Sequence, residues 1–302
     1  MDFGPTWGTT LPVNPLQSLR TVLEMIKFEH TLFALPFALI GMMLAAEGWP
    51  SWRVVLWIVV AMVGARSAAM SFNRQVDRYL DALNPRTADR ALPTGRVTPQ
   101  FVAIFTAVSC AVFVLAARQL NPLALWLSPV ALMVLFGYSY TKRFTHGSHL
   151  VLGLALAGAP LGAWIAVRGD VTSTPLVLAA AVLCWVAGFD VLYALQDLEF
   201  DRQVGLYSVP SRFGEKAALA FSAALHLIML ALLVWLPSTY PPGLGAGYWI
   251  GVAGCAALLS YQHSIVRPGD LSRLNAVFFR ANGLLALWLF SATALDLLIQ
   301  GP

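Results

Sequence analysis

The chain has 302 residues, of which 58% are hydrophobic and only 11% are charged. A soluble domain carries about 25% charged residues, so this composition excludes a soluble globular protein and indicates a polytopic membrane protein. The net charge of +4 is small and belongs to the loops, so no nucleic-acid partner is implied. The first residues lack the basic segment of a secretory signal, and we expect no cleavage there.

Nine apolar segments follow one another along the chain. Each is about 20 residues long, the length needed to cross the hydrocarbon core of a bilayer. They predict an all-α integral membrane protein with nine transmembrane helices. We expect Pro36, Pro129 and Pro160 to kink or interrupt their helices. The segments are 28–46, 53–73, 99–118, 122–140, 149–168, 174–196, 215–236, 246–264 and 278–299.

The basic residues predict the orientation of these helices. Fifteen of the 19 Lys and Arg residues precede the first segment or follow an even-numbered one, and so lie on one side. The positive-inside rule makes that side cytoplasmic, which places the N-terminus inside and the C-terminus outside the inner (cytoplasmic) membrane. We treat residues 1–302 as a single domain, with residues 1–20 as a cytoplasmic tail.

An acidic pattern occurs twice, each time where an apolar segment meets the cytoplasm. Asn73, Asp77 and Asp81 are spaced by four residues, which turn a helix by about 400°, so we expect them on one helical face. Asp197 and Asp201 repeat this spacing, and Asp197 follows Asp77 by 120 residues. Four segments separate the two copies, so the chain has the form of an internal duplication of four, four and one helices.

These carboxylates suggest a magnesium site. Carboxylates crowded on one face repel each other unless a cation lies between them. Mg²⁺ prefers oxygen ligands and usually keeps waters and substrate phosphates as its remaining ligands. A single Asp-x-x-x-Asp at a helix end is more often a solvated cap, whereas two matched copies favour a functional site. The pattern therefore points to a diphosphate bridged by metal ions at the membrane surface.

Two ionisable residues lie deeper in the apolar segments. Asp190 precedes Asp197 by seven residues, and Arg66 precedes Asn73 by seven. Ionisable groups inside a span are costly and usually mark a functional pathway. Asp190 and Arg66 could neutralise each other, or they could contact a polar substrate below the metal site, and the sequence leaves both interpretations open.

Basic residues near the acids suit a diphosphate, because Arg binds phosphate through two hydrogen bonds and Lys binds it as a point charge. Positive-inside bias also explains most of them individually. Lys27 and Tyr140 are further candidates for contacting a polar substrate, and loops 82–98 and 202–214 are candidate lids. The diphosphate candidates are Arg86, Arg90, Arg96, Lys142, Arg143 and Arg212.

The remaining reactive residues predict neither a disulfide nor a second metal centre. His146 and His149 are expected as isolated loop residues, and His226 and His263 as hydrogen-bonding groups within or at the ends of helices. We expect three small core or lipid-facing cysteines, Cys110, Cys184 and Cys255.

Three motifs resemble those of a known family. They are Asn73-Arg-x-x-Asp77-x-x-x-Asp81, the run Tyr193-Ala-Leu-Gln-Asp197-x-x-x-Asp201 with its trailing Val204-Gly205-x-x-Ser208, and Tyr140-Thr-Lys-Arg-Phe-Thr145. Together they resemble the UbiA superfamily of intramembrane aromatic prenyltransferases, over nearly the whole chain and including the count of nine spans.

Within that superfamily the chain is most similar to the 4-hydroxybenzoate polyprenyltransferases, including relatives associated with menaquinone made by the futalosine route. The run Phe189-Asp190-x-x-Tyr193-Ala194-x-Gln196-Asp197 is the most specific pointer to that branch. The chain departs from several relatives at Glu199 and Phe200, where they carry further acids.

The resemblance implies a Mg²⁺-dependent reaction at a central cavity. Asn73, Asp77 and Asp81 would hold one Mg²⁺ and the second acidic pair another, with both ions bridging the diphosphate of an allylic polyprenyl donor. The allylic cation would attack a phenol ring ortho to its hydroxyl, and an apolar chamber open to lipid would hold the isoprenoid tail. The departing pyrophosphate would be stabilised by Arg86, Arg90, Lys142 and Arg212.

The acceptor and the class of function each have alternatives. A carboxylate such as that of 4-hydroxybenzoate could pair with Arg66 or Lys142, but a naphthoate, haem or a chlorophyll precursor is also possible as acceptor. A different class is an ion-coupled transporter, although carriers place their sites near the midplane rather than at one face. A non-catalytic scaffold gives no reason for two matched clusters. No protein partner is implied.

Overall fold

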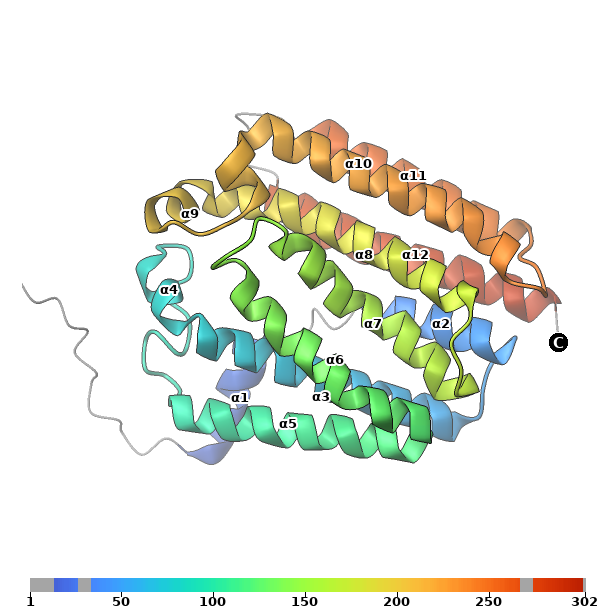
Figure 1. Ribbon diagram of the computed structural model, residues 1–302, viewed down its shortest axis with the longest axis horizontal. Helices are drawn as coiled ribbons and strands as arrows, with labels where there is room; N and C mark the ends of the chain where they lie inside the picture. Colours follow the sequence, from blue (N-terminus) through green and yellow to red (C-terminus); the bar gives the residue numbers. More distant parts are fainter. Residues whose placement is uncertain (1–13, 27–33, 267–273, 301–302) are drawn as a thin grey trace, which may run out of the picture.

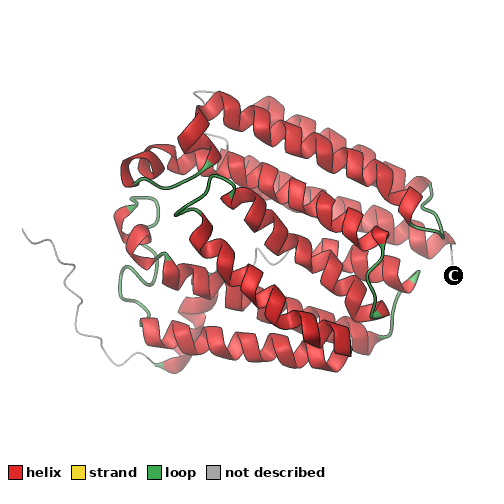
Figure 2. Cartoon of the chain, viewed as in Figure 1, coloured by secondary structure: helices red, strands yellow, loops and turns green. Residues whose placement is uncertain are grey.

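Every regular element in the described part of the chain is a helix, as expected from the sequence (Figures 1 and 2). The computed structural model describes residues 14–26, 34–266 and 274–300, without the side chains of residues 274–279. The elements are α1 (Pro15–Met25), α2 (Leu35–Ala46), α3 (Trp52–Val76), α4 (Arg78–Leu83), α5 (Pro99–Leu120), α6 (Pro122–Thr141), α7 (Ser148–Arg168), α8 (Ser173–Ala194), the 3₁₀ turn η2 (Leu195–Asp197), α9 (Leu198–Val204), α10 (Val209–Thr239), α11 (Ala246–Ile265) and α12 (Leu274–Gln300).

Among the described residues, seven helical stretches are long and apolar enough to cross a membrane, as expected for a multi-pass integral membrane protein. The nine predicted segments fall on α2, α3, α5, α6, α7, α8, α10, α11 and α12, with most ends within a few residues. Helix α2 is described over only 12 residues, and α11 is not among the seven stretches. The seven are Trp52–Val76, Pro99–Leu120, Pro122–Thr141, Ser148–Arg168, Ser173–Val204, Val209–Thr239 and Arg280–Gln300.

The structure shows no interruption at the three prolines, where a kink or an interruption was expected. Pro36 lies in the first turn of α2, where its missing N–H costs nothing, and Pro129 and Pro160 lie inside continuous helices. The interruption falls instead at Gly214 in α10, whose φ of 79° is the left-handed region that glycine adopts easily. Helix α10 thus consists of a short helix from Val209 and a long helix after Gly214, and the long helix starts where the apolar segment was predicted, at 215.

Helix α8 lies at the centre of the molecule. It packs against α7 on one side and α10 on the other (Figure 1). Its Trp185 is fully buried, stacks near Phe37 of α2 and donates a hydrogen bond from Nε1 to Asn282 Oδ1 of α12. The main apolar core forms around it from residues of α2, α7, α8, α10, α11 and α12.

Two glycines set the close approach of helices in this core. A Cβ on Gly153 of α7 would lie 2.5 Å from the carbonyl oxygen of Leu183 in α8. A Cβ on Gly41 of α2 would likewise collide with the backbone carbonyl of Pro160 in α7. Because backbone atoms cannot give way as a flexible side chain can, these helix pairs require glycine at both positions.

Both acidic motifs lie at breaks between a long and a short helix, at the same end of the bundle. Asp77 separates α3 from α4 and Asp197 precedes α9, with similar backbone angles of φ −89°, ψ 1° and φ −104°, ψ 7°. In Figure 1, α4 and α9 stand together at the end opposite the C-terminal end of α12. The duplicated pattern in the sequence thus corresponds to a duplicated helix–break–helix arrangement.

The loop after the first motif rests on the N-terminal helix. We call residues 84–97 the basic loop, because it carries Arg86, Arg90 and Arg96. Ala91 and Leu92 of this loop are buried in a small apolar cluster, separate from the main core, with contributions from α1 and α5. The residues of the cluster are Val22, Ile26, Ala91, Leu92, Val97 and Val102. Helix α1 therefore packs against the apolar side of the basic loop and holds it in place.

Candidate active site

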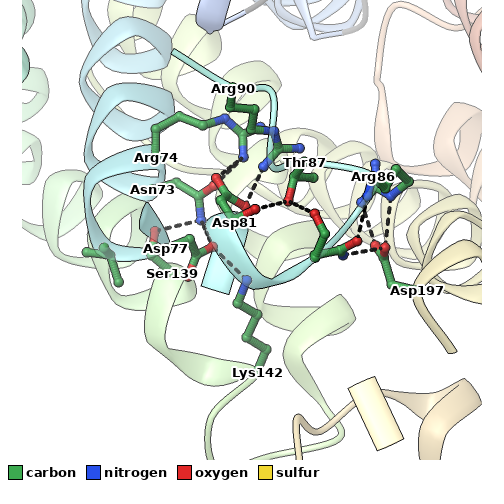
Figure 3. Close-up of polar contacts among 12 residues, drawn as sticks. Asn73, Arg74, Asp77, Asp81, Arg86, Thr87, Arg90, Ser139, Lys142 and Asp197 are labelled. Atoms are coloured by element: carbon green, nitrogen blue, oxygen red, sulfur yellow. Dashed lines mark hydrogen bonds and ion pairs between the residues drawn. The ribbon is translucent and has the colours of Figure 1, made fainter. Parts of the chain in front are cut away.

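Asp77 of the first motif is buried and bound by groups from α3 and from the turn at the end of α6. Its Oδ2 accepts hydrogen bonds from Lys142 Nζ at 2.6 Å and from Asn73 Nδ2 at 3.2 Å (Figure 3). Its Oδ1 accepts a hydrogen bond from Arg143 Nη2 at 3.0 Å. The residue is 2% exposed, so two neighbouring cations offset the cost of burying its charge. The structure thus brings Lys142 and Arg143, two of the diphosphate candidates, to the first motif.

Asp81 lies one turn beyond Asp77, because the helical hydrogen bonds continue across the break. Its N–H donates to Asp77 O at 2.7 Å. Its Oδ1 accepts a hydrogen bond from Arg90 Nη1 at 2.7 Å (Figure 3). Its Oδ2 is buried and has no hydrogen-bond partner among the described residues, and Arg74 Nη1 lies 3.9 Å from it. One lone-pair-bearing oxygen of this motif is therefore open to a further positive partner.

Asp197 of the second motif is bound by the loop that follows the first. Arg86 donates to it from Nε (2.8 Å to Oδ1) and from Nη2 (2.5 Å to Oδ2), and Asn84 Nδ2 donates at 2.9 Å (Figure 3). Arg86 also donates to the hydroxyl of Tyr193 at 3.1 Å. Burial acts to lower the pKa of Arg86, but the hydrogen bond and charge of Asp197 raise it above its ordinary value. The two halves of the duplicated chain thus share one charged site.

Asp201 is held differently, by a hydroxyl rather than by a cation. Its Oδ2 accepts a hydrogen bond from Ser208 Oγ at 3.0 Å, and Ser208 forms a capping box with Ser211 at the start of α10. Glu199, at one position where several relatives were expected to have a further acid, is an exposed residue 3.6 Å from Arg202. The departure at Glu199 therefore lies outside the contacts that hold Asp201.

Arg66 and Asp190 do not neutralise each other, and that interpretation of the sequence is wrong. Asp190 Oδ2 lies 2.7 Å from Nδ1 of His149, while Arg66 Nε is buried with no hydrogen-bond partner among the described residues. The expectation that His149 is an isolated loop residue is also wrong, since it lies in the first turn of α7 and is 3% exposed. The two deep groups therefore remain separate.

The other candidates divide into those near the acids and those away from them. Tyr140 lies under Arg143, whose guanidinium carbon is 5.4 Å from the ring centroid. Arg212 is exposed, and the described structure gives its side chain no hydrogen bond or ion pair with the acids, so the structure does not bring it to the site. Arg96 bonds to Thr94 and to the backbone of Asp89 instead. Lys27 lies outside the described residues.

The remaining histidines and cysteines behave as expected. His226 Nδ1 and His263 Nε2 form a hydrogen bond of 2.8 Å between α10 and α11, and His146 bonds to the carbonyl of Ser208. All three cysteines are free, and two are partly buried while Cys255 is fully buried.

The donor set of this site fits a hard divalent cation, although the protein groups alone do not complete its coordination. In the described part of the chain, no three His, Cys, Asp or Glu side chains converge as a ready-made metal centre. The oxygens present belong to carboxylates and to the Asn73 amide, and the unpartnered Oδ2 of Asp81 is one of them. Mg²⁺ usually takes one or two carboxylates and completes its shell with waters and phosphates, so these residues suit Mg²⁺ carried with a diphosphate.

Four residues of the site were not among the candidate site residues, although Arg74, Tyr193 and Ser208 lie in the motifs that carry the family resemblance. Asn84 and Tyr193 bind the Asp197–Arg86 pair, Arg74 approaches Asp81, and Ser208 binds Asp201. Tyr193 had a signal in the sequence, since it precedes Asp197 by one helical turn. Asn84 had none, because its contact spans 113 residues of chain.

Comparisons with known proteins give one consistent result. The model of the UbiA prenyltransferase family matches residues 34–289. A 4-hydroxybenzoate octaprenyltransferase of Vibrio vulnificus is 34% identical over 266 residues, covering 87% of this chain and 92% of that protein. One of the same name from Saccharophagus degradans is 32% identical over 301 residues, covering 97% and 98%.

Solved structures agree in fold. A UbiA homologue from Aeropyrum pernix superposes with a TM-score of 0.81 at 33% identity, covering 89% of this chain and 98% of that one. A UbiA homologue from Archaeoglobus fulgidus bound to GPP and Mg²⁺ has a TM-score of 0.70 at 18% identity, covering 91% and 99%. At that identity the second likeness shows the fold alone.

Proposed function

The chain belongs to the UbiA prenyltransferase family, and from this premise we propose that it transfers a polyprenyl group from a polyprenyl diphosphate to 4-hydroxybenzoate in quinone biosynthesis. The relatives named 4-hydroxybenzoate octaprenyltransferase support this acceptor, because they match most of the chain. Membership of an enzyme family also removes support from the transporter interpretation. A naphthoate remains the alternative acceptor, with menaquinone as the product pathway.

One observation carries the proposal more than any other. Acids from both halves of the chain meet bases from the first half at a single site (Figure 3). Lys142, in the turn at the end of α6, reaches Asp77, and Arg86 from the basic loop reaches Asp197. A diphosphate needs both kinds of group, since cations bind its oxygens directly and carboxylates hold the metal that it carries.

Each group of residues has a definite role in this proposal. Mg²⁺ held by the two motifs, with Asn73, Asp77 and Asp81 on one side and Asp197 and Asp201 on the other, would supply positive charge to the departing pyrophosphate.

The cations of the site bind the same leaving group from its other side. Arg86 and Arg90 offer it the planar, multi-donor guanidinium group, and Lys142 and Arg143 offer it donors from the turn at the end of α6. Holding these charges in place before the bond breaks stabilises the pyrophosphate as it develops. Arg212 would join them only if α10 moved, since it is exposed and apart from the acids.

The acceptor would bind on the membrane side of the acids, between α3 and α8. Asp190 lies seven residues before Asp197 in α8, and Arg66 lies seven residues before Asn73 in α3. Arg66 Nε is a buried donor with no hydrogen-bond partner among the described groups. We propose that Arg66 binds the acceptor carboxylate and that Asp190 accepts a hydrogen bond from its hydroxyl. Tyr140 and Lys27 are the remaining candidates for the acceptor, and Lys142 is the second candidate for its carboxylate.

The proposed topology follows the internal duplication. Helices α2, α3, α5 and α6 form the first four spans, α7, α8, α10 and α11 the second four, and α12 the last, around a central cavity. The C-terminal end of α12 lies opposite the end of the bundle where α4 and α9 stand (Figure 1), which supports a cytoplasmic site and an outer C-terminus in the inner membrane. Residues 1–302 would form one domain.

The proposal is tested with purified protein in liposomes, radiolabelled geranyl diphosphate, Mg²⁺ and 4-hydroxybenzoate. We expect prenylated 4-hydroxybenzoate, and its loss in Asp77→Asn and Asp197→Asn proteins that keep the wild-type unfolding temperature. Pyrophosphate release that requires a naphthoate instead would move the assignment to the alternative acceptor. Folded wild-type protein that releases no pyrophosphate with any acceptor or longer donor would overturn the proposal.

A further inference from the structure

His149 joins two parts of the candidate active site through its two ring nitrogens. Its Nδ1 lies 2.7 Å from Asp190 Oδ2 in α8, and its Nε2 accepts a hydrogen bond of 3.2 Å from the N–H of Val209 at the start of α10. The imidazole itself lies in the first turn of α7, and its side chain is only 4% exposed. Three helices therefore meet at this one side chain.

The second of these hydrogen bonds fixes the state of the ring. A backbone N–H can only donate, so Nε2 of His149 must be an unprotonated acceptor. The proton of the neutral imidazole is then on Nδ1, where it donates to the carboxylate of Asp190. Asp190 is in this way held as a hydrogen-bond acceptor, with one of its oxygens occupied.

The other carboxylate oxygen of Asp190 is the one left for a ligand. Oδ1 has no hydrogen-bond partner among the described residues, and the Asp190 side chain is 25% exposed, in contrast to the enclosed ring of His149. A carboxylate that is fixed by one oxygen presents the other in a defined direction. This is the geometry needed to accept a hydrogen bond from a phenolic hydroxyl.

The backbone that holds His149 also holds the second motif. Val209 follows Ser208, whose hydroxyl donates to Asp201 at 3.0 Å. The N–H of Tyr207 in the same segment donates to the carbonyl of Lys142 at 2.7 Å. Asp190 and Asp201 are thus both placed by residues 208–209, which links the position of the acceptor group to that of the diphosphate groups.

We propose that His149 is a positioning residue that orients Asp190 toward the hydroxyl of the aromatic acceptor. The inference rests on the proposed function and deepens it. A purely structural role would resemble that of His226, which is equally buried and forms hydrogen bonds to His263 and to the backbone of Trp185. The two histidines therefore make a matched comparison.

The test compares His149→Met with His149→Gln. Both side chains fill similar space, but only Gln keeps a donor for Asp190 and an acceptor for Val209. We expect His149→Met to raise the KM for 4-hydroxybenzoate about tenfold, the effect of losing one hydrogen bond at a buried group, with an unchanged KM for geranyl diphosphate. We expect His149→Gln to restore the acceptor KM to within about threefold of the wild type.

Two controls separate positioning from stability. His226→Met should lower the unfolding temperature and leave the acceptor KM unchanged. Calorimetric titration of 4-hydroxybenzoate into protein without geranyl diphosphate measures acceptor affinity in the absence of turnover, and this affinity should be about tenfold weaker in His149→Met. If the Met variant does not fold, His149→Ala provides the same comparison.

Each result has one meaning. Active, folded His149→Met or His149→Ala protein with wild-type acceptor KM and affinity overturns the inference and leaves the proposed function intact. So does equal weakening of the acceptor by His226→Met, since positioning would then not be specific to His149. Wild-type protein that makes no prenylated product overturns the proposed function, and this inference with it.

Discussion

Arg86 and Asp197 form a two-point hydrogen-bonded pair across 111 residues of chain, with Nε–Oδ1 and Nη2–Oδ2 distances of 2.8 and 2.5 Å. Arg86 belongs to the loop after the first acidic motif, whereas Asp197 belongs to the second. This pair makes the two halves of the duplicated chain interdependent. An arginine that reaches across in this way also offers a planar fork to a diphosphate lying between the motifs.

Replacing Arg86 by Lys should lower the initial rate of prenyl transfer by roughly 10- to 100-fold, because a lysine keeps the charge but loses the two-point geometry. Arg96→Lys is the matched control, since Arg96 lies in the same loop and contacts only Thr94 and the backbone of Asp89. Initial rates of pyrophosphate release at saturating acceptor provide the measurement. Equal rates for the Arg86 and Arg96 variants would show that the pair has no role in the reaction.

Lys142 should act on the donor rather than on the acceptor. Its Nζ lies 2.6 Å from Asp77, and its side chain is 34% exposed, so it is available to a diphosphate at the motif. Lys142→Gln should raise the KM for geranyl diphosphate about tenfold, as expected for one charge-assisted hydrogen bond, with little change in the KM for 4-hydroxybenzoate. Lys216→Gln, at an exposed lysine of α10, should change neither value. A rise in the acceptor KM alone would assign Lys142 to the acceptor carboxylate.

Metal removal should abolish turnover reversibly. A chelator is expected to lower pyrophosphate release to background, and added Mg²⁺ should restore it, because the carboxylates alone cannot neutralise the leaving group. Asn73→Ala should raise the Mg²⁺ concentration required for half-maximal rate several-fold, since it removes the neutral oxygen ligand that we propose for the first Mg²⁺. Full activity in the presence of chelator would argue against metal-assisted ionisation.

The close contact between α7 and α8 gives a stability prediction. Gly153→Val places a Cβ 2.5 Å from Leu183 O or closer and should lower the free energy of unfolding by about 1–3 kcal/mol or more. Gly158→Ala, on the same helix, has no atom within 4 Å of the added Cβ and should be neutral or slightly stabilising. Thermal unfolding in detergent, followed by tryptophan fluorescence, compares the two. A Gly153→Val protein as stable as the wild type would mean that the helices can separate at little cost.

The helices were predictable from the sequence because their physical cause is local. About 20 apolar residues suffice to define a span, and Thr98 and Asn121 cap α5 and α6 at the expected places. The short helix at the start of α10 was not predicted, for a reason that is also local. Ser208 forms a capping box that starts a short helix, and Gly214 breaks this helix from the long one that follows. The residues before Gly214 are too polar to belong to the apolar segment from which the span was predicted.

The contacts of the site were only partly predictable. Spacing alone put Asp77 and Asp81 one turn apart, and the structure has that arrangement. The partners of the acids are fixed by tertiary contacts such as Asn84–Asp197, which no period in the chain encodes. For the same reason Asp190 was paired with Arg66 in one interpretation of the sequence, whereas the structure pairs it with His149, whose sequence neighbourhood resembles an ordinary loop.

Helix α1 has a practical consequence for work on this protein. The family model begins at residue 34, so α1 lies outside it, yet Val22 and Ile26 cover the apolar underside of the basic loop. A chain shortened to the family boundary would keep every acid and every arginine of the site. It would also expose Ala91 and Leu92 to solvent, and the basic loop that carries Arg86 and Arg90 would lose the apolar contacts that hold it in place. Material prepared for assay should therefore begin well upstream of the recognisable domain.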